Sequence, residues 1–493
     1  MGTTAGAVAS GHIRVSESAA ALLRAGGNAF DAAVAAGFAA SVAEPMFTSL
    51  GGGGFLLARD AAGRETLFDF FTDNPGRGVP PDETHTPHFV PMTVRFPAQD
   101  QVFNIGLGAV ATPGTLAGLL HVHAKCGRLA LEEVLAPAIA LAREGVVLNE
   151  HQAYVTALLE PINTLTDRGT SLYAPGGRTP SVGDRLVNPD LAAFLERLPG
   201  EGAAALYGGD LAHAIEAEMR GSGGLLTAAD LAAYRVIERE PLALERGGCR
   251  VLTNPPPALG GELLVFALAL LDTLPTPAWE DPQRATQLLD VMREVERLRA
   301  AGASLDVADA VRRLSTGGTT HMSVVDSEGN AASLSLSNGE GSGYVAPGTG
   351  IQLNNMLGED DLHPGGFHTA PPGERIASMM APTLVLEGGT PRLALGSGGS
   401  KRIRSAILQV LVAALDHGRP LDESVETSRL HWDGDAAQVE PGFGAACEEA
   451  LAGRATLNRW PERNLYFGGV HAVARAVEAA ADPRREGAAL VIR

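Results

Sequence analysis

The chain has 493 residues, of which 45% are hydrophobic, and its 57 acidic and 38 basic side chains give a net charge of −19. This length and composition allow a large buried core, either in one α/β unit or in several domains. The acidic balance and the lack of a basic run argue against nucleic acid and anionic membrane surfaces as partners.

Cysteine and histidine usage gives no sign of a metal or redox centre. The three cysteines, Cys126, Cys249 and Cys447, are odd in number and far apart, which favours neither a disulfide framework nor a metal site. The histidines lack metal-ligand spacing, so we expect no metal and no cofactor.

The N-terminal sequence, MGTTAGAVASGHIRVSES, has no basic start followed by an apolar run. No apolar stretch reaches the length of about 18 residues that a membrane span needs without polar breaks. We therefore expect a cytoplasmic protein, or an exported one if a leader has been removed.

The first elements of the chain have clear start and stop signals. A helix is expected from Ser16 to Gly26, where a hydroxyl residue precedes helically spaced apolar residues and Gly-Gly follows. A second, alanine-rich helix is expected from Asn28 to about Ala43. Four glycines at 51–54 then precede an apolar strand, Phe55 to Ala58. No Gly-Lys-Ser/Thr follows them, which excludes a P-loop and favours a tight turn with close backbone approach.

Hydrophobic periodicity and helix-capping residues predict the elements further along the chain. Thr227 is the expected N-cap of a short helix, with Asp230 as its third residue. The remaining expected elements are a strand, Thr66 to Phe71, and helical segments at Leu129 to Leu158, Asp290 to Leu314 and Ile403 to Ala414.

The stretch Thr319-Thr320-His321 stands where a flexible Gly-Gly meets a predicted strand that runs to Asp326. A hydroxyl residue in this place is able to attack its own preceding carbonyl and become a new N-terminus. A free N-terminal Thr then carries both a nucleophile, its hydroxyl, and a base, its amine. The spacing alone also fits an ordinary Thr-Thr pair at the start of a strand.

Three stretches resemble one family, in the same order along the chain. TTHMSVVDSEGNAASLSLSNGEGSGYVAPGTGIQLNN is similar to the start of the small subunit of γ-glutamyltransferases, also called γ-glutamyl transpeptidases. AGGNAFDAAVAAGFAASVAEPMFTSLGGGGFLL and GSGGSKRI are similar to two further segments, so the resemblance runs from about residue 7 to the end. It implies the α/β (α+β) N-terminal-nucleophile hydrolase fold, a four-layer αββα sandwich.

The resemblance also implies self-cleavage between Gly318 and Thr319. The products would be a large subunit, 1–318, and a small subunit, 319–493, which remain one intertwined folded unit. The family uses the first Thr of Thr-Thr-His, so Thr319 is the expected nucleophile, although the sequence leaves Thr320 open.

The resemblance places the rest of the acyl-transfer machinery by position. Ser337 falls on a hydroxyl that hydrogen-bonds the catalytic Thr, with a strand-surface Ser as the alternative interpretation. Gly399 and Ser400 fall on the Gly-Gly whose backbone N–H groups form the oxyanion hole; such donors contribute about 3 kcal/mol each in other acyl-transfer enzymes. Asn338 lies near the place of a substrate-binding Asn, in a loop that is shorter here.

The expected donor-binding residues are only partly retained. Glu359, with Asp360 beside it, falls on the family's acidic partner for the donor amine, and Ser378 falls on the first of two serines that hold the donor carboxylate. The matching Gln, second Ser and carboxylate-gripping Arg are replaced by Met356, Met379 and Phe71. A bidentate charged contact is therefore lost. Arg77, six residues after Phe71, is either a substitute or a surface charge.

The sequence therefore predicts a self-processing N-terminal threonine amidohydrolase or acyltransferase, related to γ-glutamyltransferase, which passes a γ-glutamyl or related acyl group to water or an amine. The apolar replacements favour a less polar acyl group. One alternative is a specialised acylase of the same fold, resembling cephalosporin acylases or acting on poly-γ-glutamate. Another is an uncleaved, non-catalytic binding protein. Hydrolysis versus transfer and the oligomeric state stay open.

Overall fold

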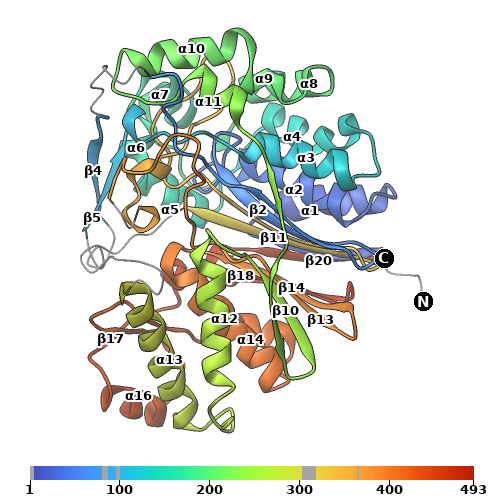
Figure 1. The fold of residues 1–493 in the computed structure, drawn as a ribbon, viewed down its shortest axis with the longest axis vertical. Coiled ribbons are helices and arrows are strands. Elements are labelled where there is room, and N and C mark those ends of the chain that lie inside the picture. Colours follow the sequence, from blue (N-terminus) through green and yellow to red (C-terminus); the bar gives the residue numbers. More distant parts are fainter. Residues whose placement is uncertain (1–4, 80–86, 96–99, 302–317, 364–365) are drawn as a thin grey trace.

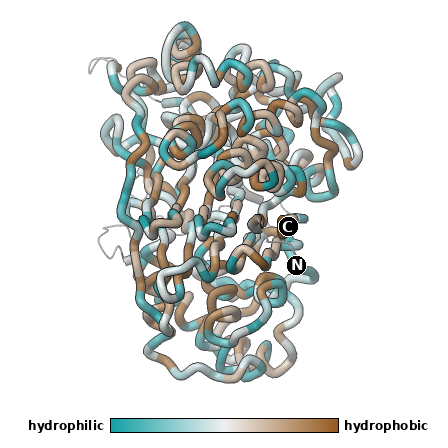
Figure 2. The backbone as a smooth tube through the Cα atoms, turned by 90° about the vertical axis from the view of Figure 1, so that its right-hand side faces the viewer, coloured by the Kyte–Doolittle hydropathy of each residue, from teal (hydrophilic) through white to brown (hydrophobic). Residues whose placement is uncertain are grey.

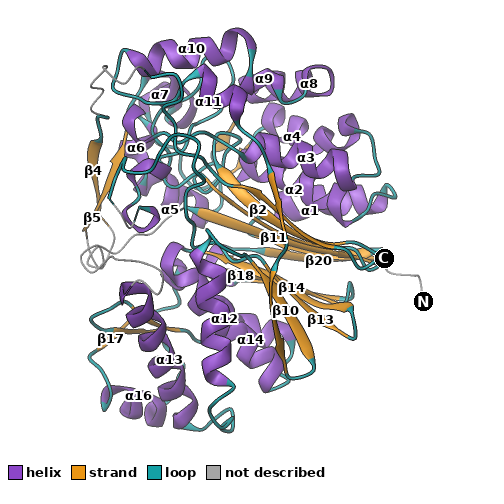
Figure 3. Ribbon diagram, viewed as in Figure 1, coloured by secondary structure: helices purple, strands orange, loops and turns teal. Residues whose placement is uncertain are grey.

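The computed structural model describes residues 5–79, 87–95, 100–301, 318–363 and 366–493. Two antiparallel β-sheets lie face to face, and helices cover the outer side of each sheet (Figures 1 and 3). This arrangement confirms the expected αββα sandwich.

The first sheet has seven strands in the order β20-β1-β11-β12-β2-β3-β8. Its strands come from both sides of the Gly318–Thr319 bond, because β11, β12 and β20 follow that bond while the other four precede it. The two chain halves therefore share one sheet and one core. The strand bounds are Gly6–Ser10 (β1), Gly53–Arg59 (β2), Glu65–Phe70 (β3), Ile237–Arg239 (β8), Thr319–Asp326 (β11), Ala331–Ser337 (β12) and Ala488–Ile492 (β20).

The second sheet has six strands in the order β19-β18-β14-β13-β10-β9. Its face packs on β11 and β12 of the first sheet. The segment that begins at Thr319 therefore lies in the middle of the molecule. The bounds are Leu242–Arg246 (β9), Cys249–Thr253 (β10), Thr383–Glu387 (β13), Thr390–Gly398 (β14), Gly469–Ala474 (β18) and Glu478–Ala481 (β19).

Helix α2 is the centre of the layer that covers the first sheet. All of its residues are buried, because it lies between the sheet and three neighbouring helices, and its alanines allow this close packing. The helices on this side are α1 (Ile13–Arg24), α2 (Ala29–Ala43), α3 (Thr115–Cys126), α4 (Leu131–Glu144), α5 (Glu150–Leu158), α6 (Glu160–Asn163), α7 (Asp167–Tyr173), α8 (Pro189–Glu201), α9 (Ala204–Tyr207), α10 (Gly209–Arg220) and α11 (Ala228–Ala233).

A second helical layer covers the other sheet, where α14 packs on β14 and β18. Its helices are α12 (Leu259–Leu271), α13 (Pro282–Ala301), α14 (Ile403–Leu411), α15 (Leu421–Glu426) and α16 (Ala445–Ala452). Short strand pairs complete the fold: β4 (Val90–Arg95) with β5 (Asp100–Ile105), β6 (Val146–Val147) with β7 (Arg185–Leu186), and β15 (Leu430–Trp432) with β16 (Ala437–Val439) and β17 (Leu457–Arg459).

The expected start of the second helix at Asn28 and the expected Thr227 cap are confirmed. Asn28 and Asp31 form a reciprocal capping box at the start of α2, and Thr227 and Asp230 form one at α11. The expected start of the first helix at Ser16 is wrong, because α1 begins at Ile13 with the imidazole of His12 as its cap. The Ser16 hydroxyl instead donates to the carbonyl of Ala488 in β20.

Two long helical predictions need correction. The segment from Leu129 to Leu158 forms two helices, α4 and α5, because Gly145 adopts a φ of 77° and ends the first one. The charged helix expected from Asp290 begins earlier, at Pro282, and the part of that prediction beyond residue 301 lies outside the described residues.

The two ends of the described chain lie side by side, since the Ala5 N–H donates to the Ile492 carbonyl and β1 pairs with β20 (Figure 2). Within the described ranges, no helix combines the length and the apolar character that crossing a membrane would require.

Candidate active site

Strand β11 begins at Thr319, and its alternating side chains face two different layers. His321 and Ser323 face the second sheet: a Cβ on Gly396 of β14 would lie 2.4 Å from the His321 ring, and the Ser323 hydroxyl donates to the His471 carbonyl of β18. Met322 and Val324 face the helical layer and belong to the core around α2. Thr319 shares the inter-sheet face with His321 because the two are two residues apart.

The register of β11 and β12 places Thr319 opposite Ser337. The Thr319 hydroxyl donates to the Ser337 hydroxyl across 3.4 Å, and the Ser337 hydroxyl donates to the Gly318 carbonyl oxygen across 2.5 Å. The Gly339 N–H also donates to the Ser337 oxygen, at 3.1 Å. One hydroxyl therefore connects the Thr319 hydroxyl to the carbonyl that precedes Thr319, an arrangement that can polarise that carbonyl and move a proton.

Thr320 has a different environment, although it is the next residue. Its hydroxyl donates to the Glu44 carboxyl, at 3.0 Å to Oε1, on the side of the strand where α2 ends. Burial raises the pKa of Glu44 to about 7, while the Thr320 hydrogen bond and Arg485 oppose the rise. The two threonines are thus distinguished by contacts that their spacing did not reveal.

The carbonyl of Thr319 is held by Arg485, near the end of the chain, and lies against Gly398 of β14. Arg485 donates to this oxygen at 2.7 Å, and a Cβ on Gly398 would lie 2.1 Å from it, so only glycine fits there. Burial lowers the pKa of Arg485 to about 10, with Glu44 and Asp482 opposing the change. Neither Arg485 nor Gly398 was predicted from the sequence. The available signals were the Arg-Arg pair in a mostly apolar C-terminal segment, for Arg485, and the GSGGSKRI stretch that contains Gly398.

Gly399 and Ser400 lie at the end of β14, beside this arrangement. Gly399 borders the same cavity as Gly318 and has a φ of 119°, which favours glycine. Ser400 has a φ of 51°, a left-handed conformation that costs a side-chain-bearing residue about 1 kcal/mol. Its hydroxyl donates to Asp361 at 2.7 Å, which offsets that cost.

Asn338, expected near a substrate-binding position, and the acidic residues expected at the donor amine lie in the loops after β12. Asn338 is buried, and its Nδ2 lies 3.5 Å from Gln352 Oε1. Glu359 is buried, and a Cβ on Gly339 would lie 2.3 Å from its Oε1, so this carboxyl is close to the backbone next to Ser337. Asp360 is half-buried, and its carbonyl accepts from the His363 N–H.

The residues expected at the donor carboxylate are core residues in this chain. Phe71 is 1% exposed, stacks on Phe55 at 5.4 Å between ring centroids, and belongs to the same buried cluster as Met356. Met379 is also buried. The Ser378 hydroxyl accepts from the Met380 N–H in a local turn, so it has a structural partner.

Of the two arginines near Phe71, Arg77 is exposed and its guanidinium packs against Gly373. Arg375, which the sequence analysis did not consider, is buried instead. It donates to the Phe71 carbonyl at 2.5 Å and pairs with Asp69 at 3.0 Å and Asp73 at 2.8 Å. The guanidinium of Arg375 therefore already forms ion pairs with two carboxylates of the protein itself.

A cavity of about 30 Å³ borders Gly318, which is room for a water molecule or two. Apolar side chains from α5 and its surroundings form most of its wall, and three charged groups complete it. The lining residues are Met46, Phe47, Val155, Leu158, Leu159, Gly318, Glu340, Gly399, Arg402, Leu465 and Arg485.

Comparison with known proteins assigns this chain to a protein family. The family model described as Gamma-glutamyltranspeptidase matches residues 15–313 and 306–492, which together span most of the chain. The chain belongs to the γ-glutamyltranspeptidase family. Its fold is the N-terminal-nucleophile hydrolase fold of that family, and the chain is an enzyme of this group.

Two relatives of this family member are named as precursors. The chain is 33% identical to the Acylase ACY 1 proenzyme of Pseudomonas sp. strain SE83, over 91% of this chain and 86% of that protein. It is 30% identical to the Glutathione hydrolase proenzyme of Escherichia coli K12, over 90% and 86%. The cephalosporin acylase structure from Bacillus halodurans shares the fold, with a TM-score of 0.83, 23% identity and coverage of 99% and 96%.

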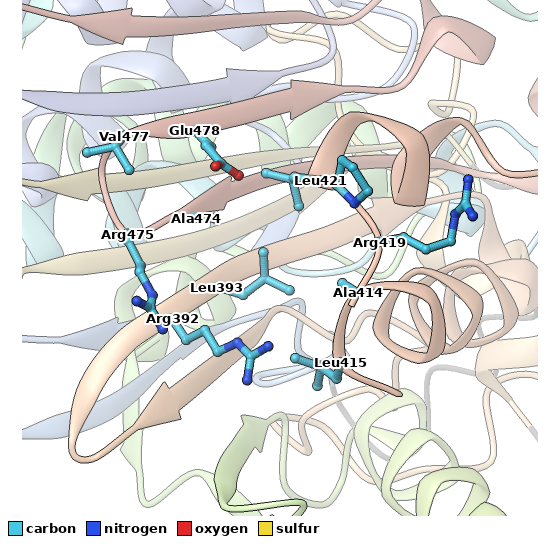
Figure 4. Close-up of a pocket in the computed structure, with 11 residues that line it drawn as sticks. Arg392, Leu393, Ala414, Leu415, Arg419, Leu421, Ala474, Arg475, Val477 and Glu478 are labelled. Atoms are coloured by element: carbon cyan, nitrogen blue, oxygen red, sulfur yellow. The ribbon is translucent and has the colours of Figure 1, made fainter. Parts of the chain in front are cut away.

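A larger groove, of about 360 Å³, lies between β14, β18 and α15 of this γ-glutamyltranspeptidase family member (Figure 4). Leu393, in its wall, is five residues from Gly398 along β14, roughly 17 Å from the Thr319 carbonyl. Its arginines are paired with carboxylates: Arg392 and Arg475 with Glu387, and Arg419 with Glu423. Because of this distance, and because the two cavities share no lining residue, the groove is separate from the candidate active site.

Proposed function

We propose that the chain is a self-processing N-terminal threonine amidohydrolase whose nucleophile is Thr319. The observation that carries this proposal is the Ser337 hydroxyl, which bridges the Thr319 hydroxyl and the Gly318 carbonyl oxygen. In self-cleavage the Thr319 oxygen bonds to the Gly318 carbonyl carbon, the carbon–nitrogen bond breaks, and the hydroxyl proton ends on the Thr319 amine. Water then hydrolyses the ester, which leaves fragments 1–318 and 319–493.

The same groups support acyl transfer after maturation. The freed amine of Thr319 serves as the base for its own hydroxyl, which attacks the carbonyl of an amide substrate. The backbone N–H groups of Gly399 and Ser400, at the end of β14, are the proposed oxyanion donors. The acyl group on Thr319 then passes to water or to an amine.

We propose a γ-glutamyl or related amide as the donor, with a preference for an acyl group less polar than γ-glutamyl. Phe71 and Met356 lie in one buried apolar cluster, and the neighbouring cation, Arg375, is already paired with Asp69 and Asp73. A donor carboxylate would therefore lack the bidentate partner that stabilises it, a loss of about 1.5–3 kcal/mol. The acylase and glutathione hydrolase names of the relatives support both acyl classes for this family member.

A panel of p-nitroanilides tests this function: γ-glutamyl, glutaryl and unbranched apolar acyl anilides, each with and without glycylglycine as acceptor. We expect turnover by the matured protein, with kcat/KM for an apolar acyl anilide at least tenfold above that for the γ-glutamyl anilide. The matched control is Thr319→Ala, which should release no nitroaniline. A γ-glutamyl preference would contradict the donor proposal, and activity in Thr319→Ala would contradict the nucleophile.

A further inference from the structure

A second set of contacts holds the peptide before the scissile bond. Gly318 has no side chain and no room for one, because a Cβ would lie 2.3 Å from the Gly339 carbonyl and 2.8 Å from the Met46 carbonyl. Only its backbone groups can be gripped. Ser337 donates to the carbonyl oxygen, while the Glu340 carboxyl lies beside the Gly318 backbone. Both residues border the same cavity, and Glu340 Oε1 is buried with no hydrogen-bond partner among the described residues, so the Gly318 N–H is available to it.

Glu340 follows β12 by three residues and is 3% exposed. The Asn355 side chain orients it: Asn355 Oδ1 accepts from the Glu340 N–H at 2.9 Å, and Asn355 Nδ2 lies 3.5 Å from Glu340 Oε2. Glu340 also lines the cavity that borders Gly318 and Gly399. Its backbone and its carboxyl are therefore fixed beside the peptide that Thr319 attacks.

The charges around Glu340 favour its neutral form. Burial raises the pKa of Glu340 to about 8, and Asp361 adds to the rise, while Asn355 and the Gly318 N–H oppose it. Burial and the neighbouring Glu340 also raise the pKa of Glu359. The cations that face this group are Arg402, which interacts with Glu340 and Asp361, and Arg485 across the cavity. Two adjacent buried carboxyls do not ionise together, so the pair keeps a proton near neutral pH.

We propose that Glu340 positions Gly318 for self-cleavage by accepting the hydrogen bond from its N–H. This inference rests on the proposed function and adds a residue that acts in maturation through the substrate peptide itself. Together, Glu340 and Ser337 would hold the N–H and the carbonyl of Gly318, on the two peptide units that flank its Cα, and so orient the carbonyl for the intramolecular attack.

The charge state of Glu340 should matter as well as its hydrogen bond. The attack places negative charge on the Gly318 oxygen, and an ionised Glu340 nearby opposes that charge, whereas the neutral acid does not. Self-cleavage should therefore slow as the pH rises and Glu340 loses its proton. Glutamine at this position keeps an acceptor oxygen and cannot ionise.

The experiment follows the intact mass of freshly made protein over time at several pH values from 6 to 9. For Glu340→Ala we expect self-cleavage at pH 7 about tenfold slower than in the parent, because the peptide is less well oriented. For Glu340→Gln we expect a rate within about threefold of the parent at pH 7, without the parent's decline between pH 7 and 9. Glu328→Gln, an exposed change in the β11–β12 turn, is the matched control.

Parental rates for Glu340→Ala, or an unchanged alkaline decline in Glu340→Gln, would overturn this inference alone. A parent that never cleaves at Gly318–Thr319 would overturn the proposed function and this inference together. Melting curves of each variant combined with Thr319→Ala show whether it folds. If the alanine variant does not fold, the pH profile of Glu340→Gln alone tests whether Glu340 acts in self-cleavage.

Discussion

The two faces of the β11–β12 pair differ sharply at the point where β11 begins. The face toward the second sheet is polar and holds Thr319, His321 and the serines of β12, joined by hydrogen bonds such as His321 to Ser335 at 2.8 Å. The face toward α2 is mostly apolar; its polar groups are Thr320 with its Glu44 partner and, at the far end of β11, Asp326, which accepts from the Ala29 N–H of α2. Two adjacent threonines with the same chemistry thus meet a carbonyl-polarising hydroxyl in one case and a buried carboxyl in the other. The difference teaches that strand alternation determines which of the two hydroxyls lies beside Ser337 and the Gly318 carbonyl.

The largest expected effect separates these two threonines. Thr319→Ala should abolish both self-cleavage and turnover, a loss of at least about a thousandfold, because the nucleophile is gone. Thr320→Val, which keeps the shape and removes the hydroxyl, should still cleave, within about tenfold of the parent rate. Denaturing gels and intact mass give both rates. The opposite pattern would assign the reaction to Thr320.

A smaller effect distinguishes two serines on the polar face. Ser337→Ala should slow self-cleavage by about a hundredfold to a thousandfold, the loss seen when one oxyanion donor is removed from an acyl-transfer enzyme. Ser335→Ala, two residues away on the same face, removes a partner of His321 and should lower stability by about 1–3 kcal/mol while leaving the cleavage rate near that of the parent. Equal cleavage rates in the two variants would show that Ser337 has no part in the reaction.

The smallest effect concerns the other face and appears as pH-dependent stability. The pKa of Glu44 is raised from 4.5 to about 7 in the folded protein, so its stabilising contribution is complete below pH 4.5 and is lost as the pH rises through 7. Uncleaved Thr319→Ala should lose about 1–3 kcal/mol through this group between pH 5 and 8. Adding Glu44→Gln should reduce that loss, as measured by denaturant unfolding at the two pH values. An unchanged loss would mean that Glu44 does not hold its proton.

Much of the fold could be predicted from the sequence, because helix starts, strand alternation and the family-like stretches are visible in short segments of the chain. The start of α2 at Asn28, the strand from Thr319 and the pairing of Thr319 with Ser337 followed from helix start signals, alternation and family resemblance. The start of α1 could not be predicted, since His12 caps it through a ring nitrogen that no common cap rule includes.

The tertiary partners of Thr319, the proposed nucleophile, and of its neighbour Thr320 could not be predicted either. Arg485 and Glu44 lie 166 and 276 residues from their partners Thr319 and Thr320, so no spacing links them. The position of Phe71 shows a further limit. The sequence revealed that an arginine was missing, but only the fold shows that Phe71 is part of a packed core and that Arg375 beside it is neutralised by aspartates.

The most direct test of the account is the intact mass of the purified protein, combined with N-terminal sequencing of any smaller fragment. We expect two fragments, 1–318 and 319–493, with the second beginning Thr319-Thr320-His321. A single full-length chain that stays uncleaved for days at working temperature would contradict it and would favour a non-catalytic binding protein. A fragment beginning at Thr320 would contradict the assignment of Thr319.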